Sequence, residues 1–233
     1  MRLAVIIPVL NEATVIVGAI ERLGDLRARG ARVIVVDGGS HDDTVARAAA
    51  ADRVVGAARG RALQMNAGAR TPEAIDGDVL LFLHADTRLP PEADRIIFRA
   101  LANSDRVWGR FDVSIAAEQP RNQVALRVVS RFMNWRSRLT GIATGDQAIF
   151  IERSSFVALD GFAPIPLMED VEFCRRARRL SRPIALPECV STSGRRWEKY
   201  GVLRTIMLMW RLRAAYFLGA DPAQLLMRYR NIR

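Results

Sequence analysis

Short apolar runs and longer amphipathic stretches alternate along the first part of the chain. Three runs rich in Val, Ile and Leu predict strands that are buried on both faces of a sheet: 3–9, 33–36 and 79–83. Helical apolar spacing follows at 13–23, 42–51 and 62–69, with a weak β run at 54–55. Strands that alternate with helices in this way predict a doubly wound, mostly parallel α/β sheet.

The second half of the chain mixes strand and helix signals without a linker between them. Residues 108–115 alternate between apolar and polar side chains, which predicts an antiparallel strand at the sheet edge. The remaining predicted elements are helices at 92–103, 124–140 and from 168 onward, a strand at 148–151, and short β pieces at 184–186 and 189–190. No repeat and no segment rich in Pro, Gly or Ser is present, so residues 1–233 are predicted to form one domain.

The tail, residues 201–233, begins with an apolar stretch that carries Arg204, Arg211 and Arg213. It predicts a helix that packs on the domain or on a second subunit, as in a homodimer. A helix that lies on a membrane surface is the alternative. Because the apolar arc is broader than in a clean interfacial helix, the pattern favours packing.

Polar side chains appear directly after two of the predicted buried strands. Asp37 follows the second run, and His84 and Asp86 follow the run 79–83. Ligands bind at the carboxyl ends of strands in open α/β sheets, so these residues are candidates for a binding site. Each acid also suits a simpler structural use, Asp37 in a turn before two glycines and Asp86 as a helix cap.

The net charge of +10 over 233 residues suits an anionic partner, such as nucleic acid, anionic lipid or a phosphorylated small molecule. The arginines are scattered over several helices without a recognition motif, which argues against nucleic acid. No Gly-x-Gly-x-x-Gly follows the first strand, which argues against a dinucleotide oxidoreductase. A nucleotidyltransferase would have a basic, glycine-rich loop there, where this chain has Asn11 and Glu12.

The lengths of the apolar runs bear on the cellular location of the protein. The N-terminal run is too short for a signal peptide, and no uncharged run is long enough to span a bilayer. Cys174 and Cys189 lack metal-ligand spacing and are expected to be reduced packing residues. The sequence therefore predicts a cytoplasmic protein, with peripheral contact at the inner face of the membrane through the tail as the alternative.

Six segments in a fixed order resemble the family 2 glycosyltransferases with the GT-A fold. They are IPVLNE at 7–12, VDGGSHDDT at 36–44, RGRALQMNAGA at 59–69, LHADT at 83–87, GDQ at 145–147 and MEDVE at 168–172. Within that family the chain is most similar to a small bacterial subgroup of short, soluble transferases. The resemblance implies a GT-A-like single domain with a nucleotide-sugar-binding half (1–115), an acceptor and catalytic half (116–200) and a helical tail (201–233).

The activity that the resemblance implies is an inverting, metal-assisted hexosyl transfer from a nucleoside-diphosphate sugar, UDP-linked, to a hydroxyl acceptor. SGRRW at 193–197 is similar to the motif of processive members, but Ser193 stands where they have Gln. Since no bilayer-spanning run is present either, we expect a single transfer per encounter. A polyprenyl-phosphate sugar synthase at the membrane surface is one alternative. A non-catalytic nucleotide- or nucleic-acid-binding protein is another.

The resemblance also assigns residues to the donor. The nucleotide-sugar site would comprise Pro8, Asn11, Glu12, Asp37, Gly39, Arg61, Asn66, His84, Ala85 and Asp86. Asp37 would accept a hydrogen bond from the base, and Arg61 would offer planar donors to the base or a phosphate. Asp86 matches the second Asp of the family's Asp-x-Asp and would bind Mg²⁺ or Mn²⁺. His84 replaces the first Asp; it would contact the ribose, add a nitrogen ligand for Mn²⁺, or serve only as a histidine at a strand end.

Glu169 and Asp170 resemble the family's catalytic acidic pair, and Asp170 is predicted to be the base that deprotonates the acceptor hydroxyl. Both acids also begin a helix, where the helix dipole favours negative charge. The acceptor side would comprise Gly145, Asp146, Arg196 and Trp197. In these roles Asp146 would hold a sugar hydroxyl, Arg196 would neutralise diphosphate, and Trp197 would stack on an acceptor sugar.

Overall fold

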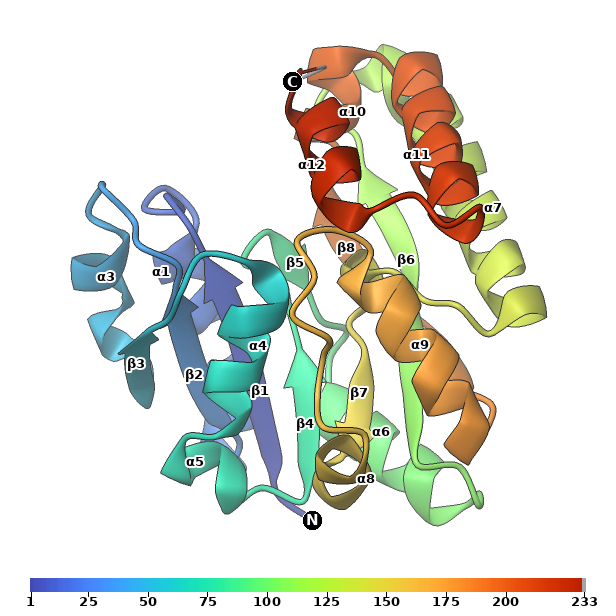
Figure 1. Ribbon diagram of the computed structural model, residues 1–233. Coiled ribbons are helices and arrows are strands. Elements are labelled where there is room, and N and C mark those ends of the chain that lie inside the picture. Colours follow the sequence, from blue (N-terminus) through green and yellow to red (C-terminus); the bar gives the residue numbers. More distant parts are fainter. Residues whose placement is uncertain (232–233) are drawn as a thin grey trace.

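One twisted sheet of eight strands runs through the computed structural model, which describes residues 1–231 (Figure 1). The strand order is β3-β2-β1-β4-β7-β6-β8-β5. The strands are β1 (Leu3–Val9), β2 (Arg32–Asp37), β3 (Arg53–Gly56), β4 (Val79–Phe82), β5 (Thr87–Arg88), β6 (Trp108–Ala116), β7 (Phe150–Glu152) and β8 (Ile184–Ser193). The first four strands of the order pair in parallel, and β7 joins them to the second half by antiparallel pairing on both of its sides. The predicted doubly wound α/β fold is confirmed.

Helices cover both faces of this sheet. One face packs against α1 (Ile16–Glu21), α2 (Gly24–Ala28) and α6 (Ala93–Ala102). The other packs against α4 (Arg61–Ala69), α5 (Pro72–Ile75), α8 (Arg153–Ala158), α9 (Glu169–Leu180), α11 (Val202–Phe217) and α12 (Pro222–Asn231). The remaining helices are α3 (Thr44–Arg47), α7 (Gln123–Thr140) and α10 (Arg195–Tyr200), with single 3₁₀ turns at Ala48–Ala50, Pro120–Asn122 and Gly145–Gln147.

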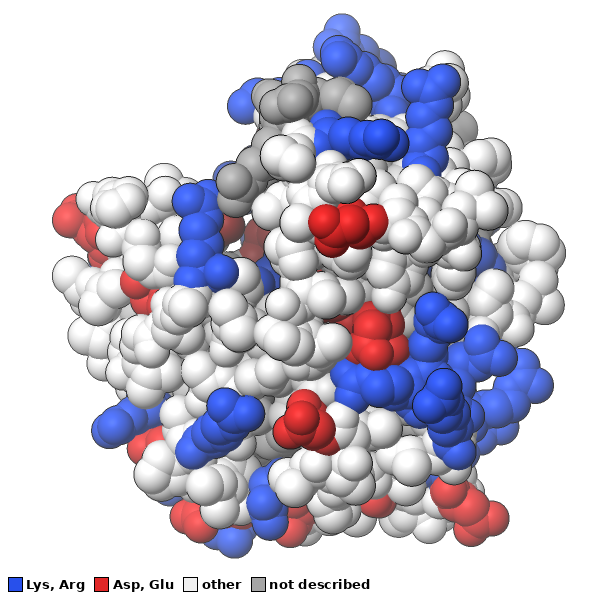
Figure 2. Space-filling model, in the orientation of Figure 1, with Lys and Arg blue, Asp and Glu red and all other residues white. Residues whose placement is uncertain are grey.

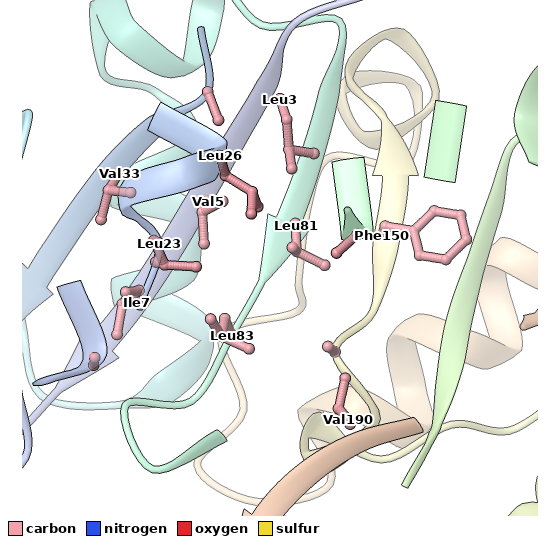
Figure 3. Packing of buried hydrophobic residues seen from close by; sticks show 14 of the residues in the cluster. Leu3, Val5, Ile7, Leu23, Leu26, Val33, Leu81, Leu83, Phe150 and Val190 are labelled. Carbon is pink, nitrogen blue, oxygen red and sulfur yellow. The ribbon is translucent and has the colours of Figure 1, made fainter. Parts of the chain in front are cut away.

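The side chains of β1 divide between these two layers because successive residues of a strand point to opposite faces. Leu3, Val5 and Ile7 lie in the layer with α1 and α2 (Figure 3), whereas Ala4 and Ile6 lie in the layer with α4. β4 is likewise buried at every position. The apolar runs at 3–9 and 79–83 are therefore central strands, as predicted.

One prediction for the second half was wrong, and another was incomplete. β6 does not lie at the sheet edge, because it pairs with β7 on one side and with β8, in parallel, on the other. The two predicted β pieces at 184–186 and 189–190 belong to the single strand β8, which stays paired with β6 across an irregularity between Phe111 and Asp112. This pairing joins segments far apart in the sequence, so local alternation could not indicate it.

The tail forms two helices rather than one. Leu212 of α11 and Leu225 of α12 are buried against the sheet layer that contains α4 and α9. The predicted packing of the tail on the domain is thus confirmed for one side of these helices. Among the residues that the structure describes, no helix has the length and apolar character needed to span a bilayer.

Gly68 of α4 lies where this helix approaches β1 and β2 most closely. A Cβ there would lie 2.6 Å from Cγ2 of Ile6 and 2.9 Å from Cγ2 of Val36. Gly68→Ala should therefore lower the free energy of unfolding by about 1 to 3 kcal/mol, the usual cost of overpacking. Gly24→Ala is the matched control, because a Cβ at Gly24 meets no atom within 4 Å. Urea unfolding of both variants measures the difference, and equal stabilities would contradict this close contact.

Candidate active site

A cavity of about 500 Å³ lies at the carboxyl ends of β1 and β4. Its lining combines residues from both halves of the chain and from the tail. From the first half come Pro8, Val9, Leu10, Glu12, Arg59, Gly60, Arg61, Gln64, His84, Ala85 and Asp86. From the second half and the tail come Asp146, Pro166, Leu167, Glu169, Thr192, Ser193, Arg195, Arg196, Trp197, Thr205, Met209, Leu226 and Tyr229. The cavity thus brings together ten of the residues to which the sequence assigned roles.

Glu12 and Asp86 supply the acidic part of the N-terminal wall. The backbone N–H of Glu12 donates to Oγ1 of Thr44 at 2.8 Å, which fixes the loop after β1. Burial and the nearby charge of Asp86 raise the pKa of the Glu12 carboxyl. The two carboxylates therefore act on each other electrostatically across the wall, although they come from the ends of different strands.

Four of the predicted nucleotide-binding residues do not line this cavity. The carboxylate of Asp37 accepts hydrogen bonds from the N–H groups of Gly39 and Ser40 and from the Ser40 hydroxyl. The side chain of Asn11 accepts from the N–H of His41 at 2.9 Å. Asp37, Gly39 and Asn11 thus shape the turns that follow β1 and β2, whatever else they contact.

Asn66 of α4 binds the segment that leads from α8 to Glu169 and Asp170. Its amide donates to the carbonyl of Phe162 at 2.7 Å and accepts from the N–H of the same residue at 2.9 Å. Two positions earlier on α4, Gln64 donates to the carbonyls of Val9 and Val36, at 2.7 and 2.8 Å. The Gln and Asn of the segment 59–69 therefore both make hydrogen bonds that hold neighbouring parts of the chain together. These bonds of Gln64 were not predicted from the sequence.

His84 and Asp146 connect the two halves at the floor of the cavity. Nδ1 of His84 lies 3.1 Å from Oδ1 of Asp146. Desolvation works to raise the pKa of the Asp146 carboxyl, but the hydrogen bond to His84 and the charges of Arg61 and Arg196 outweigh it and lower that pKa to about 2. Gly145 lies against the imidazole, since a Cβ there would be 2.7 Å from Nε2 of His84. The absence of a side chain at Gly145 therefore lets the backbone lie close to the imidazole of His84.

Glu169 and Asp170 begin α9 after Met168, whose φ of 68° turns the chain into the helix. Glu169 lines the cavity. Asp170 does not, and its two oxygens accept from the N–H groups of Gly145 at 3.1 Å and Val171 at 2.7 Å. Desolvation is the largest influence on both carboxyls, and both pKa values are raised. For Glu169 the charge of Asp170 adds to this effect.

Arg61 contributes a positive charge between the two halves. Its place in the cavity works against the charged form, but the carboxylates of Glu169, Asp146 and Asp170 outweigh this and raise the pKa of its guanidinium. The site therefore contains at least one cation that stays charged at every relevant pH, surrounded by carboxylates from the second half.

The wall opposite β1 is formed by α10 and the tail. The guanidinium of Arg196 lies over the ring of Tyr229, 4.5 Å from its centroid. Trp197, Thr205 and Met209 continue this wall. Sequence reasoning found Arg196 and Trp197 but missed the tail residues, because nothing in an apolar helical pattern distinguishes a helix that closes a cavity from one that only packs.

The donor set fits a divalent ion if another molecule completes the coordination. Among the described residues, no three His, Cys, Asp or Glu side chains lie together as metal ligands. Asp86, however, places a carboxylate at the cavity wall, close enough to Glu12 to raise its pKa. Mg²⁺ and Mn²⁺ commonly bind one or two carboxylates together with substrate phosphates and water.

Residues 4–158 match the family model described as glycosyl transferase family 2. The match includes Asp37, Asp86 and Asp146, and it ends before Glu169, Asp170 and the tail. A comparison with curated proteins returned no match.

Several solved structures share the fold. TarS from S. aureus (residues 1–349, in complex with UDP-GlcNAc) is similar with a TM-score of 0.64 and 16% identity, over 83% of this chain and 58% of TarS. Mannosyltransferase PcManGT from Pyrobaculum calidifontis, in complex with GDP-Man and Mn²⁺, has a TM-score of 0.63 and 20% identity, over 97% of this chain and 64% of PcManGT. Glucosyl-3-phosphoglycerate synthase from Mycobacterium tuberculosis, in complex with Mg²⁺ and UDP, has a TM-score of 0.53 and 21% identity, over 81% of this chain and 69% of the synthase. This chain thus spans less than two thirds of the first two proteins.

Proposed function

The chain belongs to glycosyl transferase family 2, and on that premise we propose that it moves one sugar from a UDP-linked donor to a hydroxyl acceptor, with inversion at the anomeric carbon. The observation that carries this proposal is that one cavity is lined by Glu12 and Asp86 from the first half and by Asp146, Glu169 and Arg196 from the second half. Its position at the carboxyl ends of β1 and β4 is where an open α/β sheet binds its ligand.

In this proposal the N-terminal wall holds the donor. Pro8 and Glu12 lie beside the nucleotide, and Arg61 donates to phosphate or base. Asp37, Asn11, Gly39 and Asn66 are proposed to act from the surrounding turns. Asp86 would hold Mg²⁺ or Mn²⁺, which would supply positive charge to stabilise the leaving diphosphate.

The second half is proposed to hold the acceptor. Asp146, fixed by its contact with His84, accepts a hydrogen bond from an acceptor hydroxyl, and Trp197 offers a surface for stacking. Asp170 takes the proton of the acceptor hydroxyl while the oxygen of that hydroxyl forms a bond to the anomeric carbon of the donor sugar. The bond from that carbon to the diphosphate breaks on the opposite side, and Arg196 balances the departing charge.

A polyprenyl phosphate is the second candidate acceptor. An exposed apolar face on α7 and α11 favours it, because such a face suits contact with a membrane. A phosphate acceptor is already ionised near neutral pH and needs no general base. Loss of turnover in an Asp170 variant therefore distinguishes a hydroxyl acceptor from a phosphate acceptor.

The test of the donor is thermal stabilisation by UDP, GDP, dTDP, CDP and ADP, each with and without Mn²⁺. A nucleotide at a hundred times its Kd should add about 2.7 kcal/mol, which is roughly 5 to 11 °C in Tm for a chain of this size. We expect the largest shift with UDP and Mn²⁺ together. A larger shift with GDP would correct the donor, and no shift with any of the five would contradict the proposal.

A further inference from the structure

Helices α7 and α11 lie side by side at the right of Figure 1, and both expose apolar side chains. The exposed row on α7 consists of Val124, Val128, Phe132, Trp135 and Leu139. The row on α11 consists of Leu203, Met207, Trp210 and Phe217. The ring centroids of Phe132 and Trp210 are 6.0 Å apart, so the two rows meet and form one surface, here called the α7–α11 face.

The exposed residues of this face follow the helical repeat. Its residues recur at spacings of three, four or seven positions, which places each row on one side of its helix. The opposite sides of the same helices are buried through Leu126 and Val129 on α7 and Leu212 on α11. Trp135 is 58% exposed and Trp210 is 59% exposed. Single exposed apolar residues are common on proteins, but a contiguous surface with three aromatic rings indicates a binding partner.

The charged side chains that α7 and α11 themselves place beside the face are all positive, and one of them, Arg138, is paired with the carboxylate of Asp112 of β6 at 2.6 Å. On α7 the next exposed row contains Arg127, Arg131 and Arg138, and on α11 it contains Arg204 and Arg211. The segments 119–145 and 199–220, which contain the two helices, have no Asp or Glu. Figure 2 shows further Lys and Arg side chains gathered near the top of the view and at its right edge. An anionic partner with an apolar layer beneath its charges would complement this combination.

A second copy of the chain fits the face less well. A symmetric dimer through the α7–α11 face would bring the same arginine rows together, and the segments 119–145 and 199–220 supply no acid of a second copy to balance them. An anionic bilayer meets both requirements, since its headgroups pair with arginine and its acyl boundary accepts Trp, Phe and Leu side chains.

We propose that the α7–α11 face docks this protein onto an anionic lipid surface, with both helices lying in the plane of the interface. The sequence pointed to the tail alone, and it favoured packing over membrane contact. The structure adds α7, which doubles the apolar face. Because Thr205 and Met209 on another side of α11 line the cavity, docking brings one cavity wall next to the lipid.

The experiment is cosedimentation of the whole chain with vesicles of phosphatidylcholine alone and of phosphatidylcholine mixed with phosphatidylglycerol. We expect binding to the mixed vesicles, and at least about tenfold weaker binding to neutral vesicles or at high salt. The triple variant Phe132→Ser, Trp135→Ser, Trp210→Ser should lose at least about tenfold of that binding. All three side chains are exposed, so its Tm should stay close to that of the parent chain.

The matched control is Val45→Ser with Val157→Ser. These residues are 47% and 62% exposed but lie on α3 and α8, so vesicle binding should not change. Equal binding by the triple variant, or no binding to mixed vesicles by the parent chain, would overturn the proposal. A dimer in solution that the triple variant abolishes, without vesicle binding, would assign the face to a second copy instead. None of these measurements depends on sugar transfer.

Discussion

Replacing Asp170 by Asn should lower turnover by about a hundred- to ten-thousand-fold and leave nucleotide binding unchanged. Both carboxylate oxygens of Asp170 are fixed by backbone N–H groups, those of Gly145 and Val171. Each oxygen retains a second lone pair, so the group can still accept a proton from a hydroxyl. Asn keeps the shape but has no basic oxygen, and its NH₂ group must face one of these two N–H donors, so the variant loses the proton transfer together with one hydrogen bond.

The measurement is release of nucleoside diphosphate from the donor that the thermal panel identifies, with nucleotide Kd and Tm determined for the same variant. Glu169→Gln is the matched control, because Glu169 lines the cavity and its carboxyl also has a raised pKa. Near-normal turnover in Asp170→Asn together with a large loss in Glu169→Gln would move the role of base to Glu169. Losses of equal size would mean that the pair acts as a unit.

The pH dependence of the parent chain follows from the same residues. The base must be ionised to accept a proton, so activity rises with pH as its carboxyl loses its own proton. Since burial raises the pKa of both carboxyls, the acidic limb of kcat/KM should lie above the ordinary carboxyl value of about 4. The two acids are coupled, so the apparent pKa belongs to the pair.

Replacing Asp86 by Ala should remove the part of nucleotide binding that depends on Mn²⁺ or Mg²⁺ and should reduce turnover by on the order of a thousandfold. The described residues contain no group of three metal-ligating side chains, so no neighbouring cluster can take over the ion. Asp86 lines the cavity at the position of the second Asp of Asp-x-Asp, and we therefore expect its carboxylate to bind the ion. Stabilisation by nucleotide without metal should persist.

The variant is compared with Glu12→Gln in the thermal panel, with and without Mn²⁺. Glu12 lies in the same wall and interacts with Asp86 electrostatically, so it is the other carboxylate that could bind the ion. A metal-dependent shift that survives Asp86→Ala and disappears in Glu12→Gln would assign the ion to Glu12. Persistence in both variants would contradict a carboxylate ligand in this wall.

Much of the first half could be predicted from the sequence because its signals are local. The runs around Val5 and Leu81 are apolar throughout, as strands buried on both faces must be, and the polar residues at their ends fall at the cavity. The position of β6 could not be predicted, because its parallel partner β8 lies about seventy residues further along the chain and its register is visible only in the fold.

The candidate site divides in the same way. The resemblance of short motifs pointed to Glu12, Asp86 and Asp146, and all three line the cavity. The resemblance could not show that Asp37 lies outside the cavity lining, where its carboxylate accepts hydrogen bonds from the turn after β2. Nor could it find Tyr229, which reaches the cavity only because α12 folds back and its ring meets Arg196. Such contacts depend on tertiary packing and leave no local pattern.

The two amides of α4 have a consequence for how the cavity receives its ligand. Gln64 ties β1 to β2, and Asn66 ties α4 to the segment that leads to Glu169. The elements that carry and support the cavity wall are therefore joined by hydrogen bonds within the chain, before any nucleotide arrives. The cavity is preorganised, so association loses little conformational entropy, and more of the interaction free energy remains available as affinity.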